Sequence, residues 1–142
     1  MQKIKIGVLR EEKNPPDKRV PLTPLICSEI SKNFPHVEIV VQPSPIRCYT
    51  DEEYTFFGIT LQEDLSDCDV LMGVKEVPID KLIEGKQYFF FSHTIKKQKH
   101  NQKLMRALIE KKIQMVDYET LTDKLNNRII GFGRYAGVVG AY

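Results

Sequence analysis

Short apolar runs recur along the chain and are separated by longer polar segments. Runs of this kind, rich in β-branched and aromatic residues, are typical of buried strands. The first run, at residues 4–9, carries apolar side chains toward both faces, as a strand covered on both sides would. The same pattern predicts further strands at residues 37–41, 59–61, 70–74, 87–92 and 113–116.

Helices are predicted between these strands from start signals and from periodicity. Thr23 followed by Pro24 is a cap residue with a first-turn proline, and predicts a helix that runs to about Phe34. Three more helical segments are expected: a short one near Asp51, a short one from Pro78 through Ile83, and an amphipathic one at residues 100–112.

The last part of the chain has a different pattern. Residues 120–122 and 128–131, joined by DKLNN, are expected to form a hairpin or a pair of short strands. Residues 134–142 are expected to begin a helix. Strands that alternate with helices predict an α/β fold of three layers, in which helices flank a mostly parallel sheet.

Ionisable residues follow the predicted main strands directly. They are Arg10 after the first strand, Lys75 after residues 70–74, His93 after residues 87–92, and Asp117 and Glu119 after the last. In open parallel sheets, ligands gather at the carboxyl ends of the strands. The sequence therefore predicts a polar functional site at this edge of the sheet.

Lys75 and His93 are the candidates for acid–base chemistry. A lysine at a strand end can bind a carboxylate or act as a base, and an ordinary histidine exchanges protons near neutral pH. Each has a plainer interpretation, because a lysine is usually solvated and a histidine can simply cap a strand end. For His36, in a connector, and His100, at a helix start, the plainer interpretation is favoured.

Arg10 and Arg19 flank the first loop and could bind an acidic substrate, because arginine makes bidentate contacts with carboxylates. Lys13 and Lys18 lie nearby, so a solvated basic loop is the alternative. Glu119 could orient a catalytic group or alter its pKa, or it could be a surface carboxylate.

Composition narrows the class of protein. The chain has 142 residues, 42% of them hydrophobic and 28% charged, which is enough for one globular domain with a core. A net charge of +2 and the lack of a long apolar run indicate neither a nucleic-acid nor a membrane partner. Three scattered cysteines and no signal-peptide pattern predict reduced thiols in a cytoplasmic protein, with no disulfides or metal site.

A glycine-rich segment at residues 131–137, GFGRYAG, is similar to a dinucleotide fingerprint but has the wrong spacing. That fingerprint also needs a preceding strand and an acidic residue about 20 positions later. We therefore assign no cofactor-binding residue to this segment, and expect its small residues to allow close helix packing.

Several motifs, in order, are similar to one enzyme superfamily. The opening IGVLREEKNPPDKRVPLTP resembles the start of the alanine dehydrogenase, pyridine nucleotide transhydrogenase and saccharopine dehydrogenase proteins. The segments ITLQEDLSDCDVLMGVKEVP, YFFFSHTIKKQ and MVDYETLTDKLNNRIIGFGRYAGVVGAY resemble the lysine–ketoglutarate reductases and lysine-forming saccharopine dehydrogenases in particular. The resemblance covers nearly the whole chain.

The resemblance implies roles for individual residues. In that family, the lysine of the GVKE motif and the histidine of the FSHT motif are the acid–base pair, here Lys75 and His93. It further implies that Arg19 binds the substrate carboxylate, that Glu119 tunes the pair, and that Glu76 is the acidic neighbour of the lysine.

The resemblance also implies a domain arrangement. Residues 1–133 would form a Rossmann- or flavodoxin-like substrate and catalytic domain, and residues 134–142 the start of an interdomain helix. A separate Rossmann domain, not in this chain, would bind NAD or NADP. The expected activity is that of an amino-acid dehydrogenase acting on an amino acid and a 2-oxo acid, with this chain inactive alone.

Three hypotheses about the function remain open at this point. The first is a saccharopine-type dehydrogenase, the second an alanine dehydrogenase that uses pyruvate and ammonia, and the third a binding module without catalysis. A homo-oligomer is a further expectation.

Overall fold

The sheet is parallel throughout and lies at the centre of the molecule. The computed structural model describes residues 3–131 and 133–141. Within these residues, six strands are arranged in the order β3-β2-β1-β4-β5-β6. Their bounds are β1 Ile4–Val8, β2 Val37–Val41, β3 Thr60–Leu61, β4 Val70–Lys75, β5 Gln87–Phe91 and β6 Gln114–Asp117. The α/β fold with a parallel sheet, predicted from the sequence, is confirmed.

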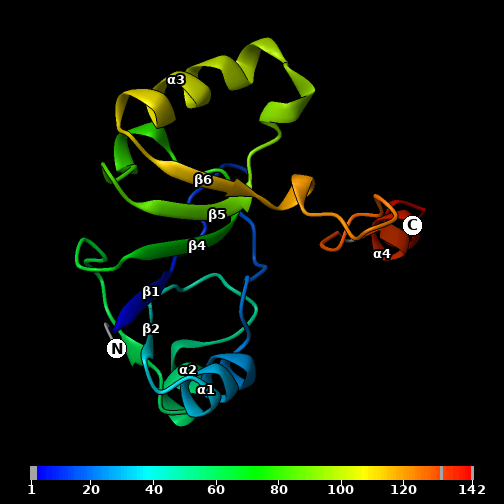
Figure 1. Cartoon of the computed structure of the whole chain (residues 1–142). Coiled ribbons are helices and arrows are strands. Elements are labelled where there is room, and N and C mark those ends of the chain that lie inside the picture. Colours follow the sequence, from blue (N-terminus) through cyan, green and yellow to red (C-terminus); the bar gives the residue numbers. More distant parts are fainter. Residues whose placement is uncertain (1–2, 132, 142) are drawn as a thin grey trace.

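The chain has four α-helices in its described residues, of which the first three lie against the sheet (Figure 1). They are α1 Pro24–Asn33, α2 Asp51–Phe56, α3 Gln102–Glu110 and α4 Gly133–Gly140. Figure 1 shows α3 beside β5 and β6, and α1 and α2 near β2. Single 3₁₀ turns occupy Ile79–Lys81, Thr94–Lys96, Lys99–Asn101 and Tyr118–Thr120.

Alternation along the strands separates the core into clusters on opposite faces. On the α3 face, Leu71, Tyr88 and Phe90 pack against Leu104 and Leu108 of the helix. On the other face, a second cluster joins residues of α1, β1 and β2, namely Val8, Cys27, Ile39 and Val41. Successive strand residues point to opposite faces, so Tyr88 and Phe90 of β5 join the α3 face, whereas Phe89 and Phe91 belong to a separate cluster.

A third cluster lies beneath the carboxyl ends of the central strands. Phe91 packs edge-on against Tyr118, with ring centroids 5.1 Å apart, and Val74 completes the buried group. The end of β4, which carries Lys75, and the end of β5, which precedes His93, therefore pack on buried apolar side chains. This packing limits the movement of both strand ends.

The predicted helix starts at Thr23 and near Asp51 are confirmed. The Thr23 hydroxyl accepts a hydrogen bond from the Ile26 N–H, 3.4 Å away. Thr50 and Glu53 form a reciprocal capping box at the start of α2.

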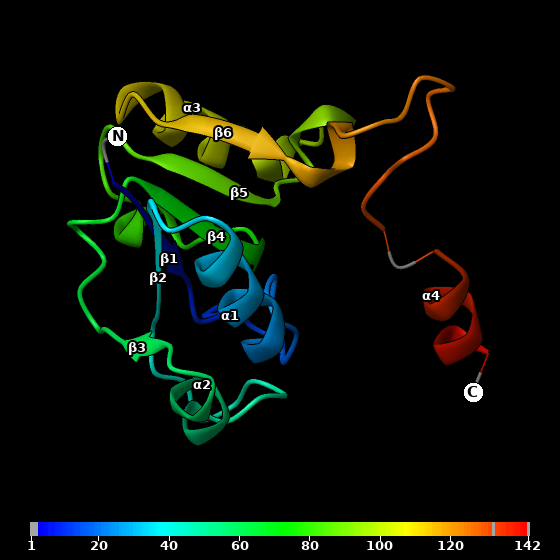
Figure 2. The same ribbon diagram turned by 60° about the horizontal axis from the view of Figure 1, so that its bottom comes forward.

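Some predicted elements differ from the structure. The helix predicted from Pro78 is only the 3₁₀ turn Ile79–Lys81, and α3 begins at Gln102 rather than residue 100. The predicted hairpin is reduced to one antiparallel bridge between Thr122 and Arg128. Short strand pairs are marginal without a sheet to join, and residues 121–131 extend away from the sheet in both views (Figures 1 and 2).

Helix α4 stands apart from the layered body, at the end of this extended segment (Figure 2). The side chains of Tyr135 and Val139 on α4 are largely exposed. The segment that connects β6 to α4 passes the carboxyl edge of the sheet, where it forms one wall of the cavity described next.

Candidate active site

A cavity of about 380 Å³ lies at the carboxyl ends of β4 and β5. The residues that line it come from the first loop, from both strand ends and from the segment after β6: Arg19, Lys75, Phe91, His93, Glu119, Arg128, Ile129, Gly131 and Gly133. Four of the six residues predicted from the sequence, Lys75, His93, Glu119 and Arg19, therefore border one space. We call it the site cavity.

Lys75 is the last residue of β4 and is held through its backbone. The pairing of β4 with β5 is irregular between Met72 and Lys75. At this irregularity, the Glu11 carboxylate accepts the N–H groups of Val74 at 2.6 Å and of Lys75 at 2.9 Å. Burial raises the pKa of Glu11, although these two hydrogen bonds oppose the shift. Sequence reasoning missed Glu11, because only the pairing of β1 with β4 brings it to the end of β4.

His93 follows β5 in a left-handed backbone conformation, with φ of 56°. The Asn101 side chain donates a hydrogen bond to the His93 carbonyl, at 2.8 Å. The imidazole stacks on Phe91, with ring centroids 6.5 Å apart and 19° between the planes. Because 27% of the side chain remains exposed, the ring is both held in place and reachable by a ligand.

Glu119 is the carboxylate nearest to His93. Its Oε2 lies 3.1 Å from His93 Nδ1, and its Oε1 lies 3.4 Å from Lys96 Nζ and 3.8 Å from Arg128 Nη2. Burial of this side chain, which is 7% exposed, would raise its pKa. The positive charges of His93 and Lys96 outweigh burial and lower the pKa of Glu119. The glutamate is therefore an anion that can orient and stabilise a protonated histidine.

The Asp17 carboxylate holds the Arg19 guanidinium in place. Arg19 Nε donates to Asp17 Oδ1 at 2.9 Å, and Nη2 bonds to Asp17 Oδ2. These bonds lower the pKa of Asp17 and raise that of Arg19. A guanidinium fixed in this way is suited to bind a second carboxylate in the cavity.

Arg128 is a cavity residue that the sequence analysis did not single out. It lies in the segment after β6, with its guanidinium carbon 6.0 Å from the centroid of the Phe91 ring. No local signal marks it, because its position at the cavity depends on the path of residues 121–131 after β6. Together with Arg19 it gives the cavity two guanidinium groups.

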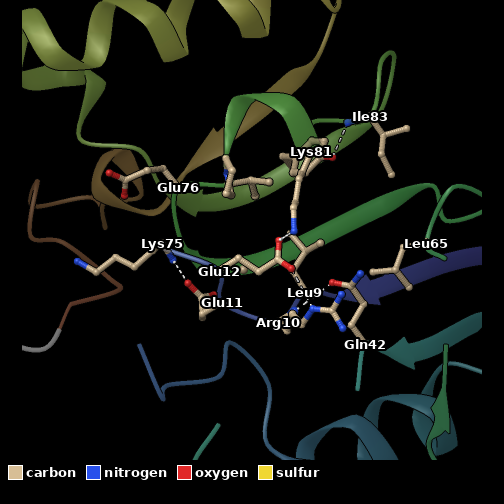
Figure 3. Close-up of a pocket in the computed structure, with 14 residues that line it drawn as sticks. Leu9, Arg10, Glu11, Glu12, Gln42, Leu65, Lys75, Glu76, Lys81 and Ile83 are labelled. Carbon is tan, nitrogen blue, oxygen red and sulfur yellow. Dashed lines mark hydrogen bonds and ion pairs between the residues drawn. The ribbon is translucent and has the colours of Figure 1, made fainter. Parts of the chain in front are cut away.

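Arg10 lies in a different place from the site cavity. Its guanidinium bonds to Glu63 through both terminal nitrogens and to Glu12 through Nε, at 3.0 Å. It lines a smaller cavity of about 100 Å³ between the ends of β1 and β4, shown in Figure 3. In that view the Lys75 side chain points away from Arg10 and Glu12.

Glu76 also lies outside the lining of the site cavity. It forms an ion pair with Lys13 of the first loop. Burial opposes ionisation of Glu76, but the hydrogen bond and positive charge of Lys13, together with a backbone hydrogen bond and the nearby His93, outweigh burial and lower its pKa. Glu76 thus fastens the first loop to the residue after Lys75.

The glycine-rich segment shows no dinucleotide-binding geometry in its described part. Gly131 precedes α4 without belonging to a strand, and the described residues 121–131 hold only the single bridge noted above. Gly131 and Gly133 instead border the site cavity. Phe132, inside the motif, lies outside the described residues.

Residues 3–131 and 133–141 contain neither a membrane-spanning helix nor a metal-binding cluster. No helix in these ranges is long and apolar enough to cross a membrane. No group of three or more histidine, cysteine, aspartate or glutamate side chains there is arranged to hold a metal ion.

The fold and the cavity define a parallel α/β domain with ionisable groups gathered at the carboxyl edge of its sheet. The chain belongs to the family described as alanine dehydrogenase/PNT, N-terminal domain, whose model matches residues 7–139. Two solved structures share the fold: an L-alanine dehydrogenase, with a TM-score of 0.70 and 18% identity, and a transhydrogenase from Sinorhizobium meliloti, with 0.68 and 15%. They cover 87% and 84% of this chain, which covers 35% and 36% of theirs.

Relatives with higher sequence identity than these structures include an alpha-aminoadipic semialdehyde synthase and a saccharopine dehydrogenase. The mitochondrial alpha-aminoadipic semialdehyde synthase of Mus musculus is 40% identical over 135 residues, which is 95% of this chain and 14% of the relative. A saccharopine dehydrogenase [NAD(+), L-lysine-forming] of Yarrowia lipolytica is 29% identical over 139 residues, 94% of this chain and 37% of the relative. The chain thus spans well under half the length of these relatives.

The lowered pKa of Glu119 predicts how stability depends on pH. A carboxyl group with a depressed pKa in the folded state stabilises the fold above its unfolded pKa, near 4.5, and loses this effect as pH falls through the folded pKa. Glu119→Gln should therefore make thermal stability fall less steeply below about pH 4.5, measured as Tm against pH. Parallel curves for the two proteins would contradict this assignment.

Proposed function

We propose that this chain is the substrate-binding and acid–base domain of a nicotinamide-dependent dehydrogenase acting on C–N bonds. The proposed type is a lysine-forming saccharopine dehydrogenase or lysine–ketoglutarate reductase. One observation carries the proposal: Lys75, His93 and two arginines, Arg19 and Arg128, surround a single cavity. The names of the two relatives described above support the same reaction type.

In this proposal the arginines hold the carboxylates of the substrates. Arg19 enters from the first loop and Arg128 from the segment after β6, so they approach the cavity from different elements. A dicarboxylic 2-oxo acid can bind both guanidinium groups at once, whereas a monocarboxylic acid can bind only one. Two charge-assisted, bidentate contacts would also fix the oxo carbon relative to Lys75 and His93.

Lys75 and His93 move protons in the steps between amine and oxo acid. The amine adds to the oxo carbon to give a carbinolamine, and loss of water from it gives an imine. One group takes a proton from the amine nitrogen, and the other gives a proton to the departing oxygen. Glu119, at 3.1 Å from His93 Nδ1, stabilises the histidine while it carries the proton. The reduced form of NAD or NADP, bound elsewhere in the full enzyme, would supply the hydride that reduces the imine.

Alanine dehydrogenase is the second candidate function, favoured by the structural match to an L-alanine dehydrogenase. The protein that carries this domain should turn over lysine with 2-oxoglutarate more efficiently than ammonia with pyruvate, by more than about tenfold in kcat/KM. The physical reason is the pair of arginines, one for each carboxylate of 2-oxoglutarate.

Steady-state kinetics with both substrate pairs and both cofactors is the measurement. A preference for pyruvate and ammonia would replace the proposal with alanine dehydrogenase. Binding of an oxo acid without turnover of either pair would identify a binding module.

A cytoplasmic location and a homo-oligomeric assembly belong to this proposal as well. Support for a reducing compartment comes from Cys27, Cys48 and Cys68, which are free thiols in the structure. Fractionation and light scattering of the protein are the corresponding measurements.

A further inference from the structure

A buried carboxylate lies behind the site cavity, at the end of β6. Asp117 is 5% exposed and is not among the residues that line the cavity. Among the described residues, no ion pair to Asp117 occurs within 4.0 Å. Burial of a carboxylate is costly unless its oxygens accept hydrogen bonds, so the partners of Asp117 indicate what this charge holds together.

All of these partners belong to the two segments that carry His93 and Glu119. Asp117 Oδ1 accepts the Glu119 N–H at 2.9 Å and the Ser92 N–H at 3.4 Å. Its Oδ2 accepts the hydroxyl of Ser92, which is fully buried. One carboxylate therefore fixes the residue before His93 and the backbone of Glu119 at the same time.

The hydroxyl of Ser92 extends this arrangement past His93. Ser92 Oγ accepts the Thr94 N–H at 3.1 Å and lies 2.7 Å from Thr94 Oγ1. Both neighbours of His93 are thus bonded through one serine hydroxyl that is itself held by Asp117.

His93 needs such support because of its backbone. A φ of 56° is uncommon for a residue with a Cβ, and such conformations persist where the surroundings enforce them. Without the bonds at Ser92 and Thr94, the segment could return to an ordinary conformation. The imidazole would then leave its place 3.1 Å from Glu119.

We infer that Asp117 is a positioning residue, which acts with Ser92 to hold the His93 imidazole beside the Glu119 carboxylate for proton transfer. This inference rests on the proposed function, because it gives His93 a role in turnover. Asp117 itself touches no substrate, and its effect passes through the two backbone segments. A purely structural role would instead contribute to folding and leave the chemistry of correctly folded molecules unchanged.

The test uses the full-length protein that contains this domain. Asp117→Ala should lower kcat by about 10²-fold, because small displacements of a catalytic group are costly in rate. KM should change by less than about threefold, since Asp117 makes no hydrogen bond to either arginine. Asp117→Asn keeps two acceptor bonds and should recover most of kcat, and Ser92→Ala should lower kcat in the same direction as Asp117→Ala.

Two readouts separate positioning from stability. The pH–rate profile of Asp117→Ala should shift in the same direction as that of Glu119→Gln, because Glu119→Gln neutralises the anion beside the histidine and Asp117→Ala displaces it. The double variant Ser92→Ala/Asp117→Ala should be no slower than Asp117→Ala alone, since residues that act through one network are not additive.

The chain offers matched controls. Asp64 and Ser66 form the same kind of pair, with the Ser66 N–H and hydroxyl each 2.9 Å from the Asp64 carboxylate, in an exposed loop between β3 and β4. Asp64→Ala should leave kcat and the pH profile unchanged. Ile39→Ala, in the core at β2, gives a destabilised protein with an intact site.

The outcomes distinguish this inference from the proposed function. If His93→Gln retains wild-type kcat, both fall. If His93→Gln is slow but Asp117→Ala and Ser92→Ala match Ile39→Ala in kcat and pH profile, only the positioning role is wrong. Should Asp117→Ala fail to fold, Ser92→Ala decides by the same criteria.

Discussion

Replacing Lys75 with methionine or His93 with glutamine in the full-length protein should lower kcat by about 10²–10⁴-fold, the usual effect of removing an acid–base group. Both substitutions keep much of the side-chain volume but remove the ability to exchange a proton. Both residues sit at the ends of neighbouring strands, β4 and β5, and border the same cavity. The loss should appear in kcat and in the pH dependence of the rate.

Controls for this prediction lie at the opposite edge of the sheet. His36 and Lys86 directly precede β2 and β5, so they are at the amino ends of these strands. His36→Gln and Lys86→Met should leave kcat unchanged. Turnover that stays within a few-fold of wild type in both Lys75→Met and His93→Gln would remove the proposed acid–base pair.

Replacing Arg19 or Arg128 with methionine should raise KM for the oxo acid by about 10- to 150-fold, which corresponds to about 1.5–3 kcal/mol for a hydrogen bond to a charged group. For Arg19 the effect should persist in Arg19→Lys, because a lysine cannot reproduce the fork that bonds Asp17 and a carboxylate together. Initial-rate kinetics with the oxo acid varied is the measurement.

Arg10 provides the informative comparison. Its guanidinium is bonded to Glu63 and Glu12, and it lines the smaller cavity (Figure 3). Arg10→Met should therefore leave KM unchanged, as should Arg106→Met on the exposed side of α3. A rise in KM for Arg10→Met comparable to that for Arg19→Met would return Arg10 to the substrate site.

Local patterns were sufficient for much of the fold. Apolar runs identified the strands, and Thr23 with Pro24 identified the start of α1, because strand and cap signals depend on adjacent residues. The hairpin expected at residues 120–131 was wrong in extent, since its pairing depends on a neighbouring sheet that this segment leaves. Boundaries moved wherever tertiary packing rather than local preference ends an element.

Some residues of the candidate site could be identified from local sequence patterns, and others only from the folded structure. Lys75, His93 and Glu119 could be singled out because each follows a recognisable strand, and carboxyl ends of parallel strands share one edge. Glu11 and Asp117 could not be given their places, because each acts on a strand that is next to its own only in the folded sheet. Arg128 reaches the cavity only through the path of a long, irregular segment.

The sequence by itself therefore determined the class of fold, the order of strands and helices along the chain, and which ionisable groups stand at strand ends. These follow from hydrophobic periodicity and from local hydrogen bonding. The tertiary structure decided which of those groups meet. Strand order β3-β2-β1-β4-β5-β6 sets the ends of β4 and β5 side by side, and turns Arg10 toward Glu63 instead. That choice depends on pairing between distant segments, for which no local residue pattern carries the information.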